Sequence, residues 1–204
     1  MLSTKSHWEK AWSGADPKTK SWFQDEARHS LELIEASAIA HDEAIIDVGG
    51  GASSLVDALL SQGHTNLSVL DISEAALQSA QDRLGAAASS VKWLCADAVS
   101  WTPAHPFRLW HDRAVFHFLT TTEDRALYRA IAKAAIVPGG HMIMATFALD
   151  GPQKCSGLPV QRYGAQSLAD EFSDGFQLIE GIAVAHTTPG GAIQKFQYCR
   201  FLRS

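Results

Sequence analysis

A carboxylate followed at once by a run of glycines is the first feature of this sequence that suggests ligand binding. Asp47 ends a short apolar run, and Gly49 and Gly51 stand just after it. A glycine turn between a strand and a helix presents backbone N–H groups at the carboxyl edge of a sheet, where open α/β sheets bind nucleotide-like cofactors. Asp71 follows Gly49 at the distance typical of an acid that binds ribose hydroxyls.

The residues of this turn distinguish between cofactors. An NAD-binding turn has the pattern G-x-G-x-x-G, but Ser54 stands at its third glycine. Asp47 would face a pyrophosphate unfavourably, whereas it suits a ligand with a positive charge. The turn therefore favours a cationic nucleotide-like cofactor, with an NAD-dependent oxidoreductase as the alternative.

A second group of titratable side chains follows the fourth apolar run of the chain: His111, Asp112 and His117. In one interpretation they are general bases or groups that orient a substrate. In another they bind a metal, but His-Asp-x4-His is not a recognised ligand spacing, so we expect no metal site. In a structural interpretation, Asp112 pairs with Arg113 or caps a helix, and His117 is a hydrogen-bonded core residue. The sequence leaves the catalytic and the structural roles open.

Two further regions contain residues suited to contact a substrate. Trp8, Trp12 and Trp22 crowd a terminus that would normally be polar, so we expect them to pack over a ligand as a lid. A long loop over residues 150–163 follows the fifth expected strand, a common place for substrate binding. The candidate substrate-binding residues outside the tryptophans are Cys155, Arg162, Tyr163 and His186.

Alternating strand and helix patterns from residue 44 onward must position these side chains. Apolar runs predict strands over residues 44–48, 67–71, 91–95, 107–110, 141–147, 176–186 and 193–202. Helical spacing predicts helices around residues 55–60, 73–84, 122–134 and 166–172, a loop over 85–90, and a helix stop at 138–140. The alternation predicts an α/β fold with a mainly parallel, doubly wound sheet of seven strands and an antiparallel last strand.

The N-terminal part has a different pattern. Residues 27–39 carry apolar side chains at helical spacing, after the Trp-rich stretch. We expect residues 1–43 to form a Trp-rich helical cap or lid, and residues 44–204 to form the Rossmann-like domain.

Composition limits the classes of protein. The 204 residues are 46% hydrophobic, enough for one domain with a core, and the net charge of -5 argues against a protein that clamps nucleic acid. No apolar run is long enough to span a bilayer, and the first ten residues lack a signal-type hydrophobic stretch. Three scattered cysteines form no CxxC pair, so neither a disulfide framework nor a zinc site is encoded. We expect a soluble, cytoplasmic protein whose oligomeric state the sequence leaves open.

Four ordered motifs resemble those of the class I S-adenosylmethionine-dependent methyltransferases. They are Asp47-x-Gly49-x-Gly51, Asp71, Cys95-Ala96-Asp97-Ala98 and Val137-Pro138-Gly139-Gly140, spread over roughly residues 44–202. The resemblance implies that Asp47 and the glycines hold the methionine end of S-adenosylmethionine, that Asp71 binds the ribose, and that Asp97 and Ala98 meet the adenine. The implied cofactor-binding set is Asp47, Gly49, Gly51, Asp71, Ile72, Asp97, Ala98 and Trp22.

The resemblance also implies an activity, methyl transfer that leaves S-adenosylhomocysteine, with His111, Asp112 and His117 beneath the transferring methyl group. Asp112-Arg113-Ala114 and the 150–163 loop resemble thiopurine and thiol methyltransferases, whereas His7-Trp8 and Ser21-Trp22-Phe23 resemble small protein lysine methyltransferases. We favour a small-molecule acceptor, with protein lysine as the runner-up. A non-catalytic partner subunit is a further alternative, disfavoured by the intact Gly49, Gly51, Asp71 and Asp97.

Overall fold

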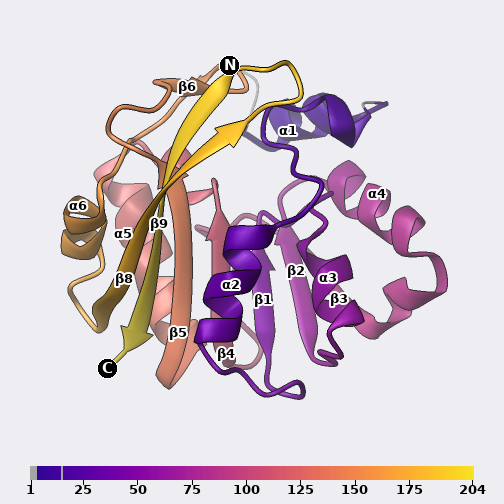
Figure 1. Cartoon of the computed structure of the whole chain (residues 1–204). Helices are drawn as coiled ribbons and strands as arrows, with labels where there is room; N and C mark the ends of the chain where they lie inside the picture. The colour runs from indigo at the N-terminus through magenta and orange to yellow at the C-terminus, as the bar shows by residue number, and fades with distance from the viewer. Residues whose placement is uncertain (1–3, 15) are drawn as a thin grey trace.

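The computed structural model describes residues 4–14 and 16–204, which fold around one seven-stranded sheet (Figure 1). The strands run in the order β3 (Val91–Cys95), β2 (Leu67–Asp71), β1 (Ile45–Val48), β4 (Phe107–Arg113), β5 (Ile136–Phe147), β9 (Ile193–Arg203) and β8 (Phe176–Thr187). β9 is antiparallel to both of its neighbours, and the other pairs are parallel. The predicted mainly parallel sheet with an antiparallel last strand is confirmed.

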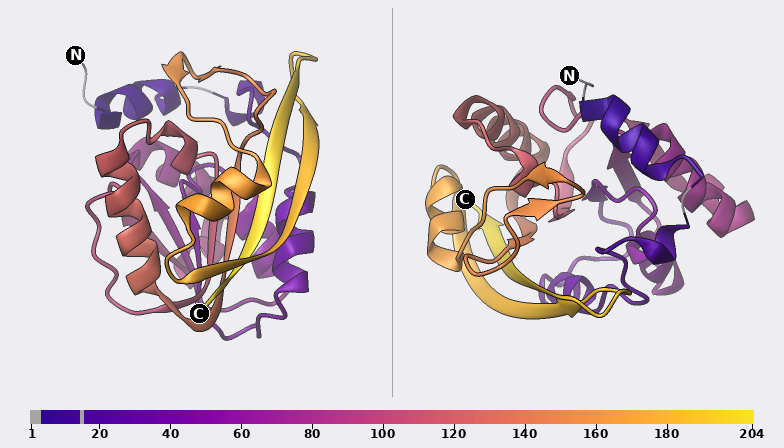
Figure 2. Two further views of the ribbon diagram at one scale, coloured as in Figure 1. Left: turned by 90° about the vertical axis from the view of Figure 1, so that its left-hand side faces the viewer. Right: turned by 90° about the horizontal axis from the view of Figure 1, so that it is seen from above.

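Helices cover both faces of the sheet, as the left view of Figure 2 shows for α2 (Arg28–Ala36) and α5 (Thr122–Ala135). One face packs against α2, α3 (Leu55–Ser61) and α4 (Glu74–Leu84), and the other packs against α5 and α6 (Ala165–Glu171). Because side chains alternate along a strand, Ile45 and Leu109 belong to the α2 face, whereas Ile46 and Trp110 belong to the α5 face.

The α2 helix belongs to this packing as well as to the N-terminal cap. Leu33 and Ile34 are almost fully buried and lie in the same core cluster as Ile45 and Leu109. The expected helix over 27–39 is thus present, over a shorter range. Residues 4–14 and 16–43 contribute both a cover of the sheet and an element above it.

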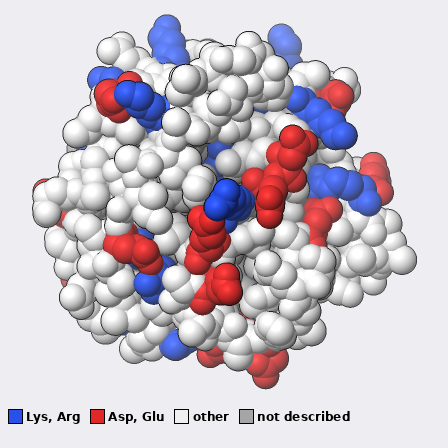
Figure 3. Space-filling model, in the orientation of Figure 1, with Lys and Arg blue, Asp and Glu red and all other residues white. Residues whose placement is uncertain are grey.

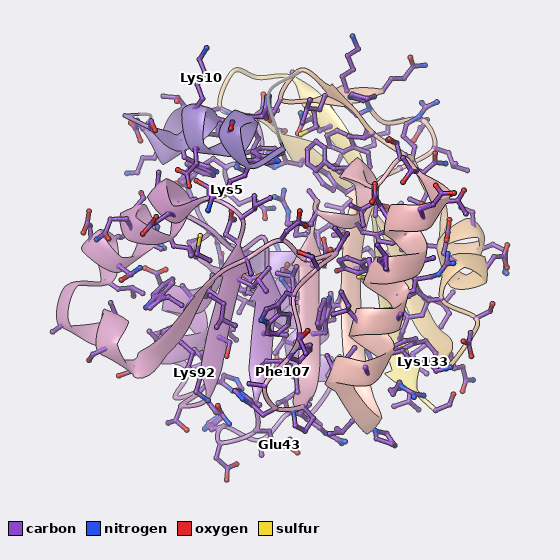
Figure 4. All side chains as sticks on the ribbon, turned by 180° about the vertical axis from the view of Figure 1, so that it is seen from behind. Lys5, Lys10, Glu43, Lys92, Phe107 and Lys133 are labelled. Atoms are coloured by element: carbon purple, nitrogen blue, oxygen red, sulfur yellow. The ribbon has the colours of Figure 1, made fainter. Side chains whose placement is uncertain are left out.

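That element is α1 (Thr4–Trp12), which lies above the carboxyl ends of the strands beside α4 (Figure 2, right). Trp8 packs edge-on against Phe118 at 5.0 Å between ring centroids. The short hairpin of β6 (Lys154–Cys155) and β7 (Leu158–Pro159) borders the same end of the molecule from another side. Phe107 and Glu43 mark the opposite end of the sheet in Figure 4. The carboxyl ends of the parallel strands, where the glycine turn follows β1, are therefore covered by α1 and bordered by the β6–β7 hairpin.

Several element boundaries differ from those expected. β4 continues to Arg113, because its last residues pair with both β1 and β5. β5 begins at Ile136, which pairs with Phe107, so Pro138-Gly139-Gly140 lies inside a strand and the preceding helix stops earlier, at Ala135. The segment expected as a loop is a 3-10 helix, η2 (Gly85–Ser90); two further 3-10 helices are η1 (Pro17–Thr19) and η3 (Phe116–Phe118).

Surface features add little about partners. None of the helices in the described ranges is both long and apolar enough to cross a membrane. On the face shown in Figure 3, Lys and Arg side chains are scattered, several of them beside Asp and Glu side chains, without one broad basic patch.

Candidate functional site

Two adjoining cavities lie at the carboxyl ends of the central strands, beneath α1. The first, called the Asp71 cavity, has walls that include Trp8, Gly49, Asp71, Ile72, Asp97 and Ala98. The second, called the Asp47 cavity, has walls that include Gln24, Ser30, Asp47, Gly50, Ser54 and His111. Both share Trp12, Trp22, Gly49 and Arg113, so the two cavities are parts of one site.

The glycine turn has the conformation and the space that glycine alone supplies. Gly49 has φ +68°, and a Cβ atom there would overlap the side chain of Val115. Gly51 also has positive φ, and its Cβ would stand 2.6 Å from Oδ2 of Asp71. These glycines let the turn between β1 and α3 pass close to Asp71 and leave its backbone open to a ligand.

Asp47 lies in a buried row of polar groups at the end of β1. Its Oδ1 is 2.6 Å from Nδ1 of His111, which therefore donates, and Nε2 of His111 is 2.8 Å from Oγ of Ser30 on α2. Oδ2 of Asp47 is buried and has no hydrogen-bond partner within the described part of the chain. A buried carboxylate oxygen without a partner is costly, so it fits a cationic group such as an ammonium.

Asp71 ends β2 and is 8% exposed. Its Oδ1 accepts a hydrogen bond from the backbone N–H of Ser73 at 2.8 Å. The pKa of Asp71 is raised to about 7, mainly by burial and to a smaller extent by the charge of Asp47, while the hydrogen bond from Ser73 acts in the opposite direction. A carboxyl in this state is poised to accept hydrogen bonds from ligand hydroxyls once it ionises.

The structure brings together most of the residues expected to bind the cofactor. Seven of them line the cavities: Asp47, Gly49, Asp71, Ile72, Asp97, Ala98 and Trp22. Gly51 lies behind Asp71 and shapes the turn rather than the wall. This set fits S-adenosylmethionine. Oδ2 of Asp47, which has no partner, suits the ammonium group at the methionine end, whereas Asp71 suits the ribose and Asp97 and Ala98 suit the adenine.

The expected cluster of His111, Asp112 and His117 is divided by the sheet. His111 faces α2 and borders the Asp47 cavity, whereas Asp112, the next residue on β4, faces α5. Neither Asp112 nor His117 lines the cavities, and both are fully buried. The idea of three titratable groups acting together on one substrate therefore needs correction, because alternation along the strand separates them.

Asp112 is fully occupied by structural hydrogen bonds. Its carboxylate accepts from the backbone N–H groups of Val115 and Phe116, at 2.9 and 3.1 Å, and from the hydroxyl of Tyr128 at 2.5 Å. Burial raises the pKa of Asp112 to about 6, although these hydrogen bonds favour the ionised form. We assign Asp112 to holding the turn after β4 against α5.

His117 has a similar place in the interior. Its Nδ1 accepts from the backbone N–H of Phe147 at 3.3 Å, and the ring packs against Phe118 and Phe147. Burial lowers the pKa of His117 to about 3, with a smaller contribution from the charge of Arg113. A histidine that stays neutral and enclosed is a positioning residue for the turn that carries Phe118.

The expected substrate-binding residues also separate into two groups. Trp8, Trp12 and Cys155 line the cavities. Burial raises the pKa of Cys155, so its side chain there is a neutral thiol. Arg162 and Tyr163 do not line either cavity.

These side chains outside the cavities have structural contacts that explain their position. Arg162 donates to the carbonyl of Gly151 at 3.1 Å, and Tyr163 is buried against Phe116. His186 lies 2.9 Å from the carbonyl oxygen of Ser21, through Nε2, and so fastens the segment that precedes Trp22. We therefore correct these three from substrate contacts to supports of the loops around the site.

Sequence reasoning missed several residues of the cavity walls, and three of them have informative positions. Ser30 hydrogen-bonds His111, Phe118 faces Trp8, and Arg113 borders both cavities. Phe118 belongs to the same run of residues as His117. No local sequence pattern predicts Ser30, because its contact with His111 depends on how α2 crosses the sheet. Across residues 4–14 and 16–204, no group of three or more His, Cys, Asp or Glu side chains is arranged to hold a metal ion.

Comparisons with known proteins agree with this geometry. Residues 45–140 match the family described as methyltransferase domain. A curated relative, EEF1A lysine methyltransferase 2 of Danio rerio, is 32% identical over 85 residues, which are 38% of this chain and 36% of that protein. The match therefore spans about a third of the length of that relative.

Solved structures are similar over nearly the whole chain. One comes from a study of the conversion of a disulfide bond into a thioacetal group during echinomycin biosynthesis; its TM-score is 0.79 at 17% identity, covering 98% of this chain and 91% of that one. Another is the Burkholderia thailandensis 1,6-didemethyltoxoflavin-N1-methyltransferase with 1,6-didemethyltoxoflavin and S-adenosylhomocysteine bound, with a TM-score of 0.72 at 19% identity, covering 98% and 87%. At these identities the likeness concerns the fold.

Proposed function

From the match of residues 45–140 to a methyltransferase domain, we propose that the chain is a class I S-adenosylmethionine-dependent methyltransferase and that it transfers the methyl group of S-adenosylmethionine to a small-molecule nucleophile. The domain match supports the resemblance of the ordered motifs, and the residues of the two cavities support the predicted cofactor. The observation that carries the proposal is one site in which Asp47 and Asp71 stand beside an aromatic wall. The domain match argues against the NAD-dependent alternative.

The chain's own residues bind and orient, while the cofactor, when bound, supplies an electrophilic methyl group on a sulfonium. In our proposal Oδ2 of Asp47 accepts from the ammonium of the methionine end, and Asp71 accepts from the ribose hydroxyls. His111 holds Asp47 in place, because its two ring nitrogens are both engaged. Asp97 and Ala98 lie where an adenine would be held.

A largely apolar wall supports a small acceptor. Trp8, Trp22, Phe118 and Cys155 border the Asp71 cavity under α1, so a bound molecule would be shielded from water. Because His111 is engaged on both sides, we expect no free strong base in the site. An acceptor atom that is already nucleophilic, such as a thiol or an uncharged amine, fits this arrangement best.

Protein lysine is the second candidate acceptor. It is favoured by the identity to the Danio rerio lysine methyltransferase, although that match covers 36% of the relative. Trp8 and Trp22 also provide aromatic faces of the kind that attract an ammonium. The two candidates differ in the size of the product, which makes them separable by experiment.

The test is to incubate the protein with methyl-labelled S-adenosylmethionine and cell extract, and then to separate small molecules from macromolecules. We expect label in the small-molecule fraction, absent with the Asp71→Ala variant, which loses a cofactor ligand. Label in protein would support the lysine candidate. Binding of S-adenosylhomocysteine without label in either fraction would favour a non-catalytic partner subunit.

A further inference from the structure

We propose that Arg113 recognises a carboxylate on the methyl acceptor, an inference that rests on the proposed function. Arg113 is the last residue of β4 and borders both cavities. Among the wall residues of these two cavities it is the one Lys or Arg side chain. The acceptor class is therefore a small molecule with a nucleophilic atom, an apolar body and one carboxylate.

The register of the sheet aims this side chain away from the cofactor residues. Arg113 is paired with Ala145 on β5, and Ala145 is paired with Tyr198 on β9. The small Ala145 lets the guanidinium reach over β5, where Nε donates to the hydroxyl of Tyr198 at 2.9 Å and the group lies 4.7 Å from the ring centroid of Phe196. The charge of Arg113 thus lies over β5 and β9. Asp47 on β1 and Asp71 on β2 lie on the other side of β4.

One nitrogen of this guanidinium is left for a ligand. Nη1 donates to the carbonyl of Trp22 at 3.0 Å, but Nη2 is buried and has no hydrogen-bond partner in residues 4–14 and 16–204. Within those ranges Arg113 also has no carboxylate in ion-pair contact, unlike Arg83, Arg108 and Arg200. A part-buried cation without a counter-ion calls for an anion.

The surroundings place that anion on the acceptor side. The charge of Arg113 acts to lower the pKa of Cys155 and of His186, two groups that flank the covering loops, whereas burial is the dominant influence on both. An anion bound to Nη2 would lie near the Cys155 and Trp22 walls, opposite the ribose end of the site.

A single charge, not a phosphate, fits this position. One free guanidinium nitrogen serves one carboxylate oxygen, and Asp47, Asp71 and Asp97 would repel a dianion. Arg113 would equally repel a lysine ammonium, so the same contact disfavours the protein acceptor. The apolar walls from Trp8 and Phe118 suit the body of a small carboxylic acid.

The experiment uses benzoate and benzamide as probes, because they share a shape and differ in charge. Their binding to the full chain saturated with S-adenosylhomocysteine is measured by calorimetry and ligand-observed NMR. We expect benzoate to bind about tenfold or more tightly than benzamide, and this preference to vanish in Arg113→Gln. Arg113→Lys should keep part of it, and Arg108→Gln, at the far end of the same strand, should keep all of it.

Each other outcome has a distinct meaning. Equal binding of the two probes, no binding of benzoate to the wild type, or a preference that survives Arg113→Gln and Arg113→Lys unchanged would overturn the proposal. A loss of S-adenosylhomocysteine affinity in Arg113→Gln and Arg113→Lys, with benzoate binding intact, would assign Arg113 to the cofactor and also overturn it. Failure of S-adenosylhomocysteine to bind the wild type would count against the proposed function itself.

Discussion

At the scale of single residues, Asp71 combines burial with a place in the cavity wall, where we propose that it binds the cofactor. Replacing it in Asp71→Asn keeps an acceptor for the Ser73 N–H but removes the negative charge. We expect S-adenosylhomocysteine to bind about ten- to hundredfold more weakly at pH 8, because hydrogen bonds to a charged acceptor are the stronger ones. Calorimetry measures this, with Asp82→Asn on the exposed part of α4 as the control. Unchanged affinity in Asp71→Asn would remove Asp71 from the cofactor site.

The same substitution is expected to stabilise the ligand-free protein at high pH. The folded-state pKa of Asp71 is about 7, above its ordinary value of 3.8, so the folded state binds this proton more tightly than the unfolded state. Tighter proton binding by Asp71 therefore stabilises the folded state fully at pH values below the ordinary pKa of 3.8. This stabilisation is lost as pH rises through about 7. Asp71→Asn should therefore be the more stable protein at pH 8, on the order of 1–3 kcal/mol, with the difference shrinking towards pH 5. Urea unfolding at both pH values checks the sign.

Asp112 leads to the opposite prediction, a loss of stability with the site intact. In Asp112→Asn one oxygen that accepts from Val115, Phe116 or Tyr128 is replaced by an amide donor. We expect the free energy of unfolding to fall by about 1–3 kcal/mol and the affinity of the folded protein for S-adenosylhomocysteine to stay near that of the wild type. Denaturant unfolding and calorimetry test the two parts. A variant of full stability that lost methyl transfer would return Asp112 to the chemistry.

At the scale of elements, α1 is fixed to α4 by a carboxylate. Oε1 of Glu9 accepts from the backbone N–H of Glu74 at 2.6 Å, and Oε2 accepts from that of Ala75 at 3.3 Å. These N–H groups are at the positive end of the α4 dipole, so Glu9 holds the helix that carries Trp8 and Trp12 over the cavities.

Glu9→Ala should release α1 while the sheet stays folded. We expect a decrease in S-adenosylhomocysteine affinity of roughly three- to tenfold, in line with the loss of a charge-assisted cap of about 1 kcal/mol. The matched control is Lys10→Ala, since Figure 4 shows Lys10 pointing away from the sheet. Equal affinities of the two variants, measured by calorimetry, would contradict the coupling of α1 to the site.

β4 shows how far the elements follow from the sequence. Its apolar start was enough to predict a strand, and helical spacing predicted α3, α4 and α5, because these signals are local. The end of β4 depends on pairing with β1 and β5, which decides that His111 and Arg113 face α2 while Asp112 faces α5. The order of the motifs predicted most of the residues that were expected to bind the cofactor and that line the cavities. The contact of Arg113 with Tyr198 could not be predicted, because it joins distant segments through a strand register that no local pattern encodes.

At the scale of the whole molecule, the core and the cover of the site are separate. The two buried core clusters contain residues from Ala27 onward, and partly buried Trp22 packs against one of them. Trp8 and Trp12 in α1 instead contact Trp22 and Phe118 at the cavity wall. Because the core that stabilises the sheet does not include α1, the cover is free to respond to ligands without unfolding the domain.

Deleting residues 1–13 therefore tests the cover directly. We expect the truncated protein to unfold cooperatively with nearly the stability of the full chain, since its core clusters are intact. S-adenosylhomocysteine affinity should fall by no more than about tenfold, because the carboxylates of Asp47 and Asp71 and the glycine turn are retained. Methyl transfer from labelled cofactor to the extract should be lost, because water enters the site and Trp8 no longer faces the acceptor. If the truncated protein transferred label at the rate of the full chain, the N-terminal tryptophans would have a packing role alone.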